Sequence, residues 1–181
     1  FPLENEILKI GIDFNVMNCN AVVCVTAGNK LIVVGEIVKQ QDTDALAREI
    51  RRRYGNNKIF VYPDASGAAR STINASKTDI AILESYGFTN MALRSNPPIK
   101  DRVQTLQAVL ENSKGQIRMA IYAKATRLIE CLELQSYDEK TGDPDKQNGY
   151  DHLNDALGYL CYREFNMIYS RAGQKTGIRI Y

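Results

Sequence analysis

LKIGIDFNV, residues 8–16, alternates apolar side chains with polar or small ones. A period of two predicts a β-strand, with the apolar side chains from Leu8 to Phe14 facing one main apolar layer. Asp13 then lies on the opposite face of the strand, where Gly11 leaves room above the sheet. The stretch therefore predicts a carboxylate that points away from the main apolar layer, beside an open space.

Two further strand-like runs follow, at residues 20–27 and 30–39. Gly28 and Asn29, which separate these runs, are a signal for a two-residue hairpin. Residues 17–19 form a similarly short turn before the first of them. The chain is therefore predicted to begin with three consecutive antiparallel strands.

A helix is predicted after these strands, because Asp42 or Thr43 can serve as its N-cap and apolar residues recur at helical spacing up to Gly55. Residues 59–62 then form a short apolar run that Pro63 closes. A strand–helix–strand unit of this length makes a right-handed crossover between parallel strands. We therefore expect the fourth strand to lie beside the first.

The second half of the chain alternates helix-like runs with short or ambiguous segments. Residues 136–150 are polar and rich in turn-forming residues, and residues 117–122 are compatible with either a strand or an extended linker. Together the patterns predict an α/β fold, in which helices flank a mixed central sheet of three antiparallel strands followed by parallel strands. The other expected elements are helices at 78–85, 101–111, 125–134 and 151–169 and a short fifth strand at 91–94.

Three aspartates lie at special places in this predicted fold: Asp13 in the first strand, Asp64 directly after the fourth, and Asp155 in the last helix. Open α/β sheets bind ligands at the carboxyl ends of their parallel strands, so Asp13 and Asp64 are expected at one edge. The residues around Asp155 do not form a solvated charged face. We therefore expect the last helix to be covered on both sides, with Asp155 and His152 facing a cleft.

A cluster of three carboxylates favours hard divalent cations, because the negative charges repel one another until a cation is bound. Two Mg²⁺ or Mn²⁺ ions about 3.5–4 Å apart would perform in-line hydrolysis of a phosphodiester. Asp13 is predicted to bridge the ions, since it lies between the elements that carry Asp64 and Asp155. His152, the only histidine of the chain, could bind a metal, orient water or assist proton transfer.

Each of these residues also has a plainer interpretation. A single aspartate at a strand end is more often a turn or cap residue, and a single histidine near a helix start is more often a surface or capping group. Asp151 is an alternative candidate for capping the last helix. The combination of the three aspartate positions is what favours a catalytic metal site.

The composition is that of an ordinary globular domain. A chain of 181 residues can bury a substantial core, and a formal net charge of +2 gives no general attraction to nucleic acid. The four cysteines show no CxxC spacing and are expected to be buried free thiols, so neither a disulfide nor a zinc site is predicted. No apolar stretch is long enough to span a bilayer, and no membrane partner is expected.

Any basic surface for DNA must therefore be local. The three arginines at 51–53 are interpreted as a solvated helix face, and GQKT at 173–176 lacks the first glycine of a P-loop. Lys140 and Lys146 lie in the polar segment that closely precedes Asp155. These two lysines are the candidates for nucleic-acid binding, through contacts to phosphates.

Three motifs carry a specific resemblance: GIDFN with Asp13, VYPDASG with Asp64, and DHLNDALGYL with His152 and Asp155. In order and spacing they resemble the nuclease domain of the tailed-bacteriophage terminase large subunit over nearly the full chain. The pattern DHxxDAxxY is the most distinctive of the three. The resemblance implies an RNase H-like (retroviral integrase-like) fold. Some members carry glutamate at the second acidic position, so Asp64 is a variant within the pattern.

The resemblance implies a metal-dependent endonuclease that cuts concatemeric viral DNA at the start and end of genome packaging. It implies metal-ligand roles for Asp13, Asp64 and Asp155, an active-site role for His152, and Mg²⁺ or Mn²⁺ as the cofactor. Double-stranded DNA is the implied substrate, and the cytoplasm of the host cell is the implied location.

Residues 1–181 are thus expected to form a single nuclease domain. Family members also carry an N-terminal packaging ATPase, and because no Walker motif occurs here, that domain is expected to be absent from this chain. The implied partners of a full-length protein are this ATPase domain, the small terminase subunit and the portal. Residues 136–150 are expected to form a hairpin or loop near the active site, and residues 170–181 a basic mobile tail.

Three other functions compete with this one. A resolvase or an RNase H on the same fold would use similar carboxylates on a different nucleic acid. A sugar-kinase or actin-like ATPase shares the opening IGIDF, but it needs a second subdomain and glycine-rich phosphate loops. A non-catalytic module that docks on DNA or on the portal would gain nothing from three clustered carboxylates near DNA.

Overall fold

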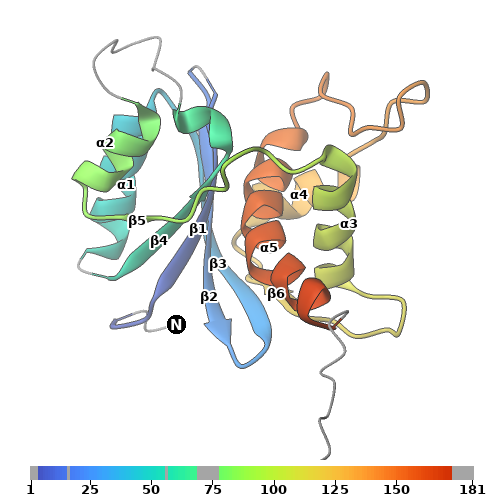
Figure 1. Cartoon of the computed structure of the whole chain (residues 1–181). Helices are drawn as coiled ribbons and strands as arrows, with labels where there is room; N and C mark the ends of the chain where they lie inside the picture. The colour runs from blue at the N-terminus through green and yellow to red at the C-terminus, as the bar shows by residue number, and fades with distance from the viewer. Residues whose placement is uncertain (1–3, 16, 56, 69–77, 173–181) are drawn as a thin grey trace, which may run out of the picture.

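The computed structural model of the chain describes residues 4–15, 17–55, 57–68 and 78–172. Of the predicted mobile tail, residues 170–181, the part from residue 173 onward, with the GQKT segment, lies outside these residues. Residues 170–172 are not a tail, because they continue the last helix. The strands form one mixed sheet in the order β5-β4-β1-β2-β3-β6 (Figure 1). They are β1 (Leu8–Asp13), β2 (Cys19–Ala27), β3 (Lys30–Gln40), β4 (Ile59–Pro63), β5 (Thr89–Asn90) and β6 (Met119–Ile121).

The pairing of the strands confirms the predicted α/β fold. β1, β2 and β3 are consecutive antiparallel neighbours, and β4, β5 and β6 each pair in parallel with a neighbour. The crossover through α1 (Thr43–Tyr54) places β4 beside β1, with Ile12 opposite Pro63. The carboxyl ends of β1 and β4 therefore meet at the same edge, as the right-handed crossover predicts.

Helices cover both faces of the sheet. α1 and α2 lie on one face, and α3, α4 and α5 lie on the other (Figure 1). Asp42 is the N-cap of α1, because its side chain accepts a hydrogen bond from the backbone N–H of Ala45 at 2.7 Å. No helix in the described part of the chain is both long and apolar enough to cross a membrane. The remaining helices are α2 (Asp79–Ser85), α3 (Ile99–Leu110), α4 (Thr126–Leu134) and α5 (Asp151–Ala172).

An apolar layer lies on each face of the sheet. Leu8, Ile10 and Ile12 are fully buried in the layer that includes α1 and α2, and a second cluster fills the space between the sheet and α5. The prediction that the apolar side chains from Leu8 to Phe14 share one face is therefore confirmed, while β2 also contributes apolar side chains such as Val22 to the second layer. Asp13 faces the α5 side, at the edge of that second layer.

Gly11 allows α5 to lie directly on β1. A Cβ atom at this position would lie 2.1 Å from the backbone carbonyl oxygen of Ala156, far inside van der Waals contact. The room that the sequence predicts above Gly11 is therefore filled by the helix backbone. This close approach determines how near the α5 side chains come to Asp13.

The predicted fifth strand is misplaced, and a segment that the sequence leaves undecided is a strand. β5 is Thr89–Asn90 rather than residues 91–94, and it ends where the Asn90 side chain accepts the backbone N–H of Ala92 at 2.8 Å. Residues 117–122 contain β6, which pairs in parallel with β3. The sequence could not decide the second case, because a three-residue strand carries too little pattern.

The prediction for the cysteines is confirmed. Cys19, Cys24, Cys131 and Cys161 are all buried and free. Burial raises the pKa of the Cys131 thiol to about 11 and also raises those of Cys24 and Cys161. These thiols therefore serve as small apolar groups of the core.

Candidate active site

The residues predicted to share a site come from three elements that meet at one edge of the sheet. Asp13 is the last residue of β1, and Asp64 directly follows β4, the parallel neighbour of β1. His152 and Asp155 lie three residues apart in the first turns of α5, so both project from the same side of that helix. α5 packs against both β1 and β4. The fold thus brings the four predicted residues into one region.

His152 contacts Asp13 directly. Its Nδ1 lies 3.0 Å from Oδ2 of Asp13, so the N–H at Nδ1 donates to the carboxylate. The amide nitrogen of Asn15 lies 3.1 Å from the same ring nitrogen, and the second ring nitrogen, Nε2, lies 4.0 Å from Oδ1 of Asp151. The hydrogen bond to Asp13 raises the pKa of His152, although partial burial opposes this. The imidazole is therefore held between two carboxylates.

Asp155 is held by an arginine that the sequence analysis missed. Arg102 of α3 donates from Nη2 to Oδ1 of Asp155 at 2.7 Å, and both side chains are buried. The guanidinium also lies over the ring of Tyr159, 4.4 Å from its centroid. Gly158 supplies the necessary space, since a Cβ there would lie 2.9 Å from Cγ of Arg102. The ring and the glycine together hold the guanidinium beside the carboxylate.

The sequence does contain a signal for Arg102. The arginine lies four and seven residues before Leu106 and Val109, on the face of α3 that is buried. A charged residue on the apolar face of a helix is buried only with a partner. The pattern therefore indicates that a carboxylate is needed, but only the packing of α3 on α5 identifies it as Asp155.

Asp64 combines its place at the sheet edge with a local turn role. Its Oδ1 accepts hydrogen bonds from the backbone N–H and the hydroxyl of Ser66, at 2.7 and 2.5 Å. These bonds support the short 3₁₀ turn Ala65–Ala68 that follows β4. The plainer interpretation of Asp64 as a turn residue thus describes part of what this side chain does.

The carboxylates are close enough to act on one another electrostatically. Burial raises the pKa of Asp13, and repulsion from Asp64 and Asp151 raises it further, against the opposing effect of His152. Burial also raises the pKa of Asp155 to about 6 in spite of Arg102, with an added contribution from Asp13. The cluster therefore carries more negative charge than its own cations balance.

Asp151 is a fourth carboxylate at this site, which the sequence analysis considered only as a cap. It is the first residue of α5 rather than the residue before the helix. It is 4 % exposed, and within the described residues its buried Oδ1 accepts no hydrogen bond. A buried carboxylate oxygen without a donor is costly, so this atom favours a bound cation as its missing partner.

The donor set fits a hard divalent cation in its chemistry. Carboxylate oxygens are the ligands that Mg²⁺ and Mn²⁺ prefer, and Asp13, Asp64, Asp155 and Asp151 supply them. Among the described residues, no three histidine, cysteine or carboxylate side chains are arranged to hold one ion as they stand. One oxygen of each predicted ligand is already bound to a protein donor: His152, Ser66 or Arg102.

We expect Arg102→Met to destabilise the domain by roughly 2 kcal/mol, because it leaves a buried carboxylate without its counter-charge. The loss is smaller than for most buried pairs, since Asp155 can take up a proton instead. Arg118→Met is the matched control, because Arg118 also lies over an aromatic ring, that of Phe165, but forms no ion pair with a described residue. Urea unfolding of both variants measures the difference, and equal losses would contradict a stabilising role for the pair.

The basic residues considered for DNA binding lie in different places. Lys146 lies near enough to Asp155 to lower its pKa, so it belongs to the surroundings of the site. Lys140 is exposed in a turn, where its backbone N–H donates to Asp138. No contact among the described residues brings Lys140 to the carboxylates. The arginines at 51–53 lie on α1, on the opposite face of the sheet, and pair with a glutamate or with backbone carbonyls.

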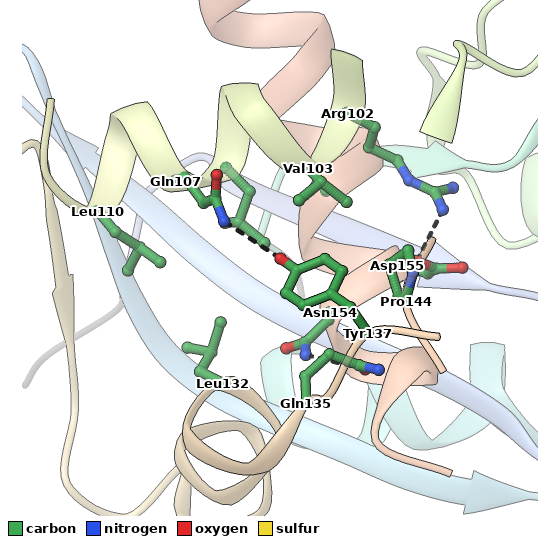
Figure 2. A pocket seen from close by; sticks show the side chains of 12 residues that line it. Arg102, Val103, Gln107, Leu110, Leu132, Gln135, Tyr137, Pro144, Asn154 and Asp155 are labelled. Atoms are coloured by element: carbon green, nitrogen blue, oxygen red, sulfur yellow. Dashed lines mark hydrogen bonds and ion pairs between the residues drawn. The ribbon is translucent and has the colours of Figure 1, made fainter. Parts of the chain in front are cut away.

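A hollow of about 240 Å³ opens beside Asp155, between α3, α4, α5 and the polar segment 136–150 (Figure 2). Gln107 donates to the hydroxyl of Tyr137 at 3.1 Å, which ties the polar segment to α3. Tyr137 and Pro144 form an antiparallel bridge within that segment. The polar segment thus lies against the helices that carry Arg102 and Asp155.

Comparison with known proteins identifies the family of this chain. The family described as "Terminase RNaseH-like domain" matches residues 10–164. None of the curated proteins matches the chain. The match to the family covers all four predicted site residues and the six strands except the first two residues of β1.

Several solved structures share the fold. The large terminase of the thermophilic bacteriophage D6E matches with a TM-score of 0.66 at 15% identity, over 90% of this chain and 42% of that chain. The nuclease domain of the P22 large terminase matches with a TM-score of 0.61 at 14% identity, over 88% and 87% of the two chains. That of bacteriophage SPP1, solved with bound Mn, matches with a TM-score of 0.60 at 16% identity, over 88% and 87%. At these identities the likeness shows the RNase H-like fold alone, and the chain spans less than half of the D6E protein.

Proposed function

Since the chain belongs to the family of terminase RNase H-like domains, we propose that it is an endonuclease that hydrolyses phosphodiester bonds of double-stranded DNA with divalent metal ions. One observation carries the proposal. Asp13 and Asp64 lie at the ends of neighbouring parallel strands, and α5 brings His152 and Asp155 to the same edge. Four side chains from three distant parts of the sequence meet there, which a docking module would not need.

The proposed ligands are Asp13, Asp64 and Asp155, with Asp13 between the other two. Electrostatic repulsion reaches Asp13 from Asp64 and reaches Asp155 from Asp13, which supports this central place. Two bound Mg²⁺ or Mn²⁺ ions would supply charge stabilisation and a more acidic water molecule. The structures of the similar SPP1 and G20c nucleases were solved with bound Mn and cobalt, which supports a divalent metal here.

His152 is proposed to orient Asp13. Its Nδ1–H donates to one oxygen of that carboxylate and so fixes the plane in which the other oxygen lies. Asn15, next to β1 in the sequence, lies beside the ring, with its amide nitrogen 3.1 Å from Nδ1. Arg102 would do the same for Asp155, by binding one of its oxygens.

In a full-length protein this domain would cut concatemeric viral DNA when packaging starts and ends. The chain spans 42% of the D6E large terminase, so a packaging ATPase domain, the small subunit and the portal are proposed partners of the whole protein. The polar segment 136–150, with Lys146 near Asp155, is proposed to guide DNA beside the site.

Cleavage of supercoiled plasmid tests the proposal. We expect nicked and linear products with Mn²⁺ or Mg²⁺ and none in EDTA, because the carboxylate cluster carries more negative charge than Arg102 and His152 balance. A four-way junction and an RNA–DNA hybrid of the same sequence are the competing substrates. Preferential cutting of either would assign the domain to a resolvase or an RNase H, and metal-independent cutting would contradict the metal site.

A further inference from the structure

A second hollow, of about 520 Å³, is lined by His152 and does not include Arg102. Its walls come from the turn before β2, the end of β3, the start of α4 and the first turn of α5. Asn18, Lys39, Arg127 and His152 are among the residues that line it. Because His152 also binds Asp13, the hollow borders the candidate active site.

The end of β3 is shaped to present Lys39 to this hollow. Cys19 pairs with Gln40 but Ala21 pairs with Ile37, so β3 carries an extra residue opposite Asn20. Such a β-bulge bends the strand and re-aims a side chain, and bulges are frequent next to active sites. The bulge thus changes the direction of the strand two strands away from Asp13.

The backbone of Lys39 is strained at this bulge. Its φ angle is +54°, in the left-handed region that lysine rarely adopts. Asn20, which is 4 % exposed, holds this conformation by accepting the backbone N–H of Lys39 at 3.1 Å. Asn20 is in turn the β-ladder partner of Asp13. A buried asparagine next to a site carboxylate therefore stabilises the strained lysine, and strain of this kind is most often kept where it serves a function.

Lys39 is also the available cation of the hollow. Its side chain is exposed, and within the described part of the chain it forms no ion pair. Arg127 donates to Glu130 at 2.6 Å and to the carbonyl oxygen of Gly149 at 3.3 Å, so its charge is partly used. Both oxygens of Glu36 accept backbone N–H groups of α4, at 3.0 and 2.7 Å, which keeps this acid from pairing with Lys39.

We propose that this hollow binds the DNA backbone next to the cleaved bond, with Lys39 as the principal phosphate contact and Arg127 as a secondary one. The inference rests on the proposed nuclease function. In it, the DNA strand leaves the active site past His152 and along this hollow. The exposed ammonium group of Lys39 lines a hollow that shares His152 with the candidate active site, so it can attract a phosphate of the DNA backbone and fix the register of the strand.

Lys39→Asn tests the inference, because asparagine tolerates the left-handed backbone and lacks the ammonium group. Lys39→Arg keeps the charge, and Lys30→Asn, an exposed lysine at the opposite end of β3, is the matched control. KM and kcat for cleavage of a duplex are measured with Mn²⁺ between ~50 and ~200 mM salt. We expect Lys39→Asn to raise KM roughly fivefold at low salt with little change in kcat, and to reduce the salt slope of kcat/KM by about one.

Lys39→Arg and Lys30→Asn are expected to behave as the wild type. If Lys39→Asn and Lys30→Asn have equal KM values and equal salt slopes of kcat/KM, the inference is overturned and the nuclease proposal remains intact. Failure of the nuclease proposal would be seen separately, as a wild-type domain that cuts no duplex with any divalent metal. In that case, binding of the same duplex in EDTA, followed by fluorescence anisotropy across the same salt range, decides the role of Lys39 by itself.

Discussion

We expect the Asp13→Asn domain to cut DNA at least ~10³-fold more slowly than the wild type while remaining folded. Asp13 is the ligand that we propose to be shared by two ions, because it interacts electrostatically with both Asp64 and Asp155. Asparagine has the same shape but one neutral oxygen in place of a charged pair, so metal affinity and charge stabilisation are both lost. The measurement is the initial rate of plasmid cleavage in Mn²⁺.

A fold-level readout separates loss of the metal site from loss of structure. Burial and neighbouring carboxylates raise the pKa of Asp13, so its ionised form opposes folding at neutral pH. The metal-free Asp13→Asn domain should therefore melt at the same temperature as the wild type or a few degrees higher. Mn²⁺ should raise the melting temperature of the wild type and not that of the variant.

Glu84→Gln is the matched control for this experiment, since Glu84 is exposed on α2, on the other face of the sheet. It should change neither cleavage nor the response to Mn²⁺. Full cleavage by Asp13→Asn would rule out the proposed metal site, and a collapsed melting temperature would show that Asp13 is needed for folding instead.

The second large effect concerns Gly11, for which we expect Gly11→Ala to destabilise the domain by at least about 4 kcal/mol. The added Cβ would lie 2.1 Å from the backbone carbonyl oxygen of Ala156, and a backbone atom in the middle of a long helix cannot move alone. α5 would have to lift from β1, which opens the apolar layer between them. A loss of this size is a large part of the free energy of unfolding of a typical domain, which is about 5–15 kcal/mol.

Gly35→Ala is the control for Gly11→Ala. A Cβ at Gly35 would meet only the hydroxyl of Tyr54, at 2.7 Å, and the end of a tyrosine side chain can rotate away. We expect this variant to lose about 1 kcal/mol or less. Urea unfolding followed by circular dichroism compares the two, and similar losses would show that contact between β1 and α5 does not limit stability.

Much of the fold could be predicted because its signals are local. The alternation in residues 8–16, the Gly28-Asn29 turn and the helix before residue 59 were sufficient for three antiparallel strands and one parallel crossover. The parallel pairing of β1 and β4 that this crossover predicts then places Asp13 and Asp64 at the same edge. The sequence misplaces β5 and does not decide whether residues 117–122 contain a strand. Both strands are very short, so they are defined by their pairing with neighbouring strands rather than by a pattern of their own.

The pairings inside the site could not be predicted in the same way. Arg102 is 53 residues from Asp155 in the sequence, and their contact depends on how α3 packs against α5. The unpaired oxygen of Asp151 and the bulge at Lys39 likewise exist only relative to side chains from other elements. Each of these features depends on how closely two separate elements pack, and the periodicity of the sequence holds no information about that distance.

The sequence by itself determined which residues could act here, since side-chain period and chain direction assign Asp13, Asp64, His152 and Asp155 to one edge of the sheet. Tertiary structure decided how they act, by setting α5 against Gly11, Arg102 against Asp155 and His152 against Asp13. The physical reason is the distance along the chain over which each kind of interaction acts. Backbone periodicity is local and is read along the chain, whereas burial, repulsion between carboxylates and close packing depend on distances across the fold.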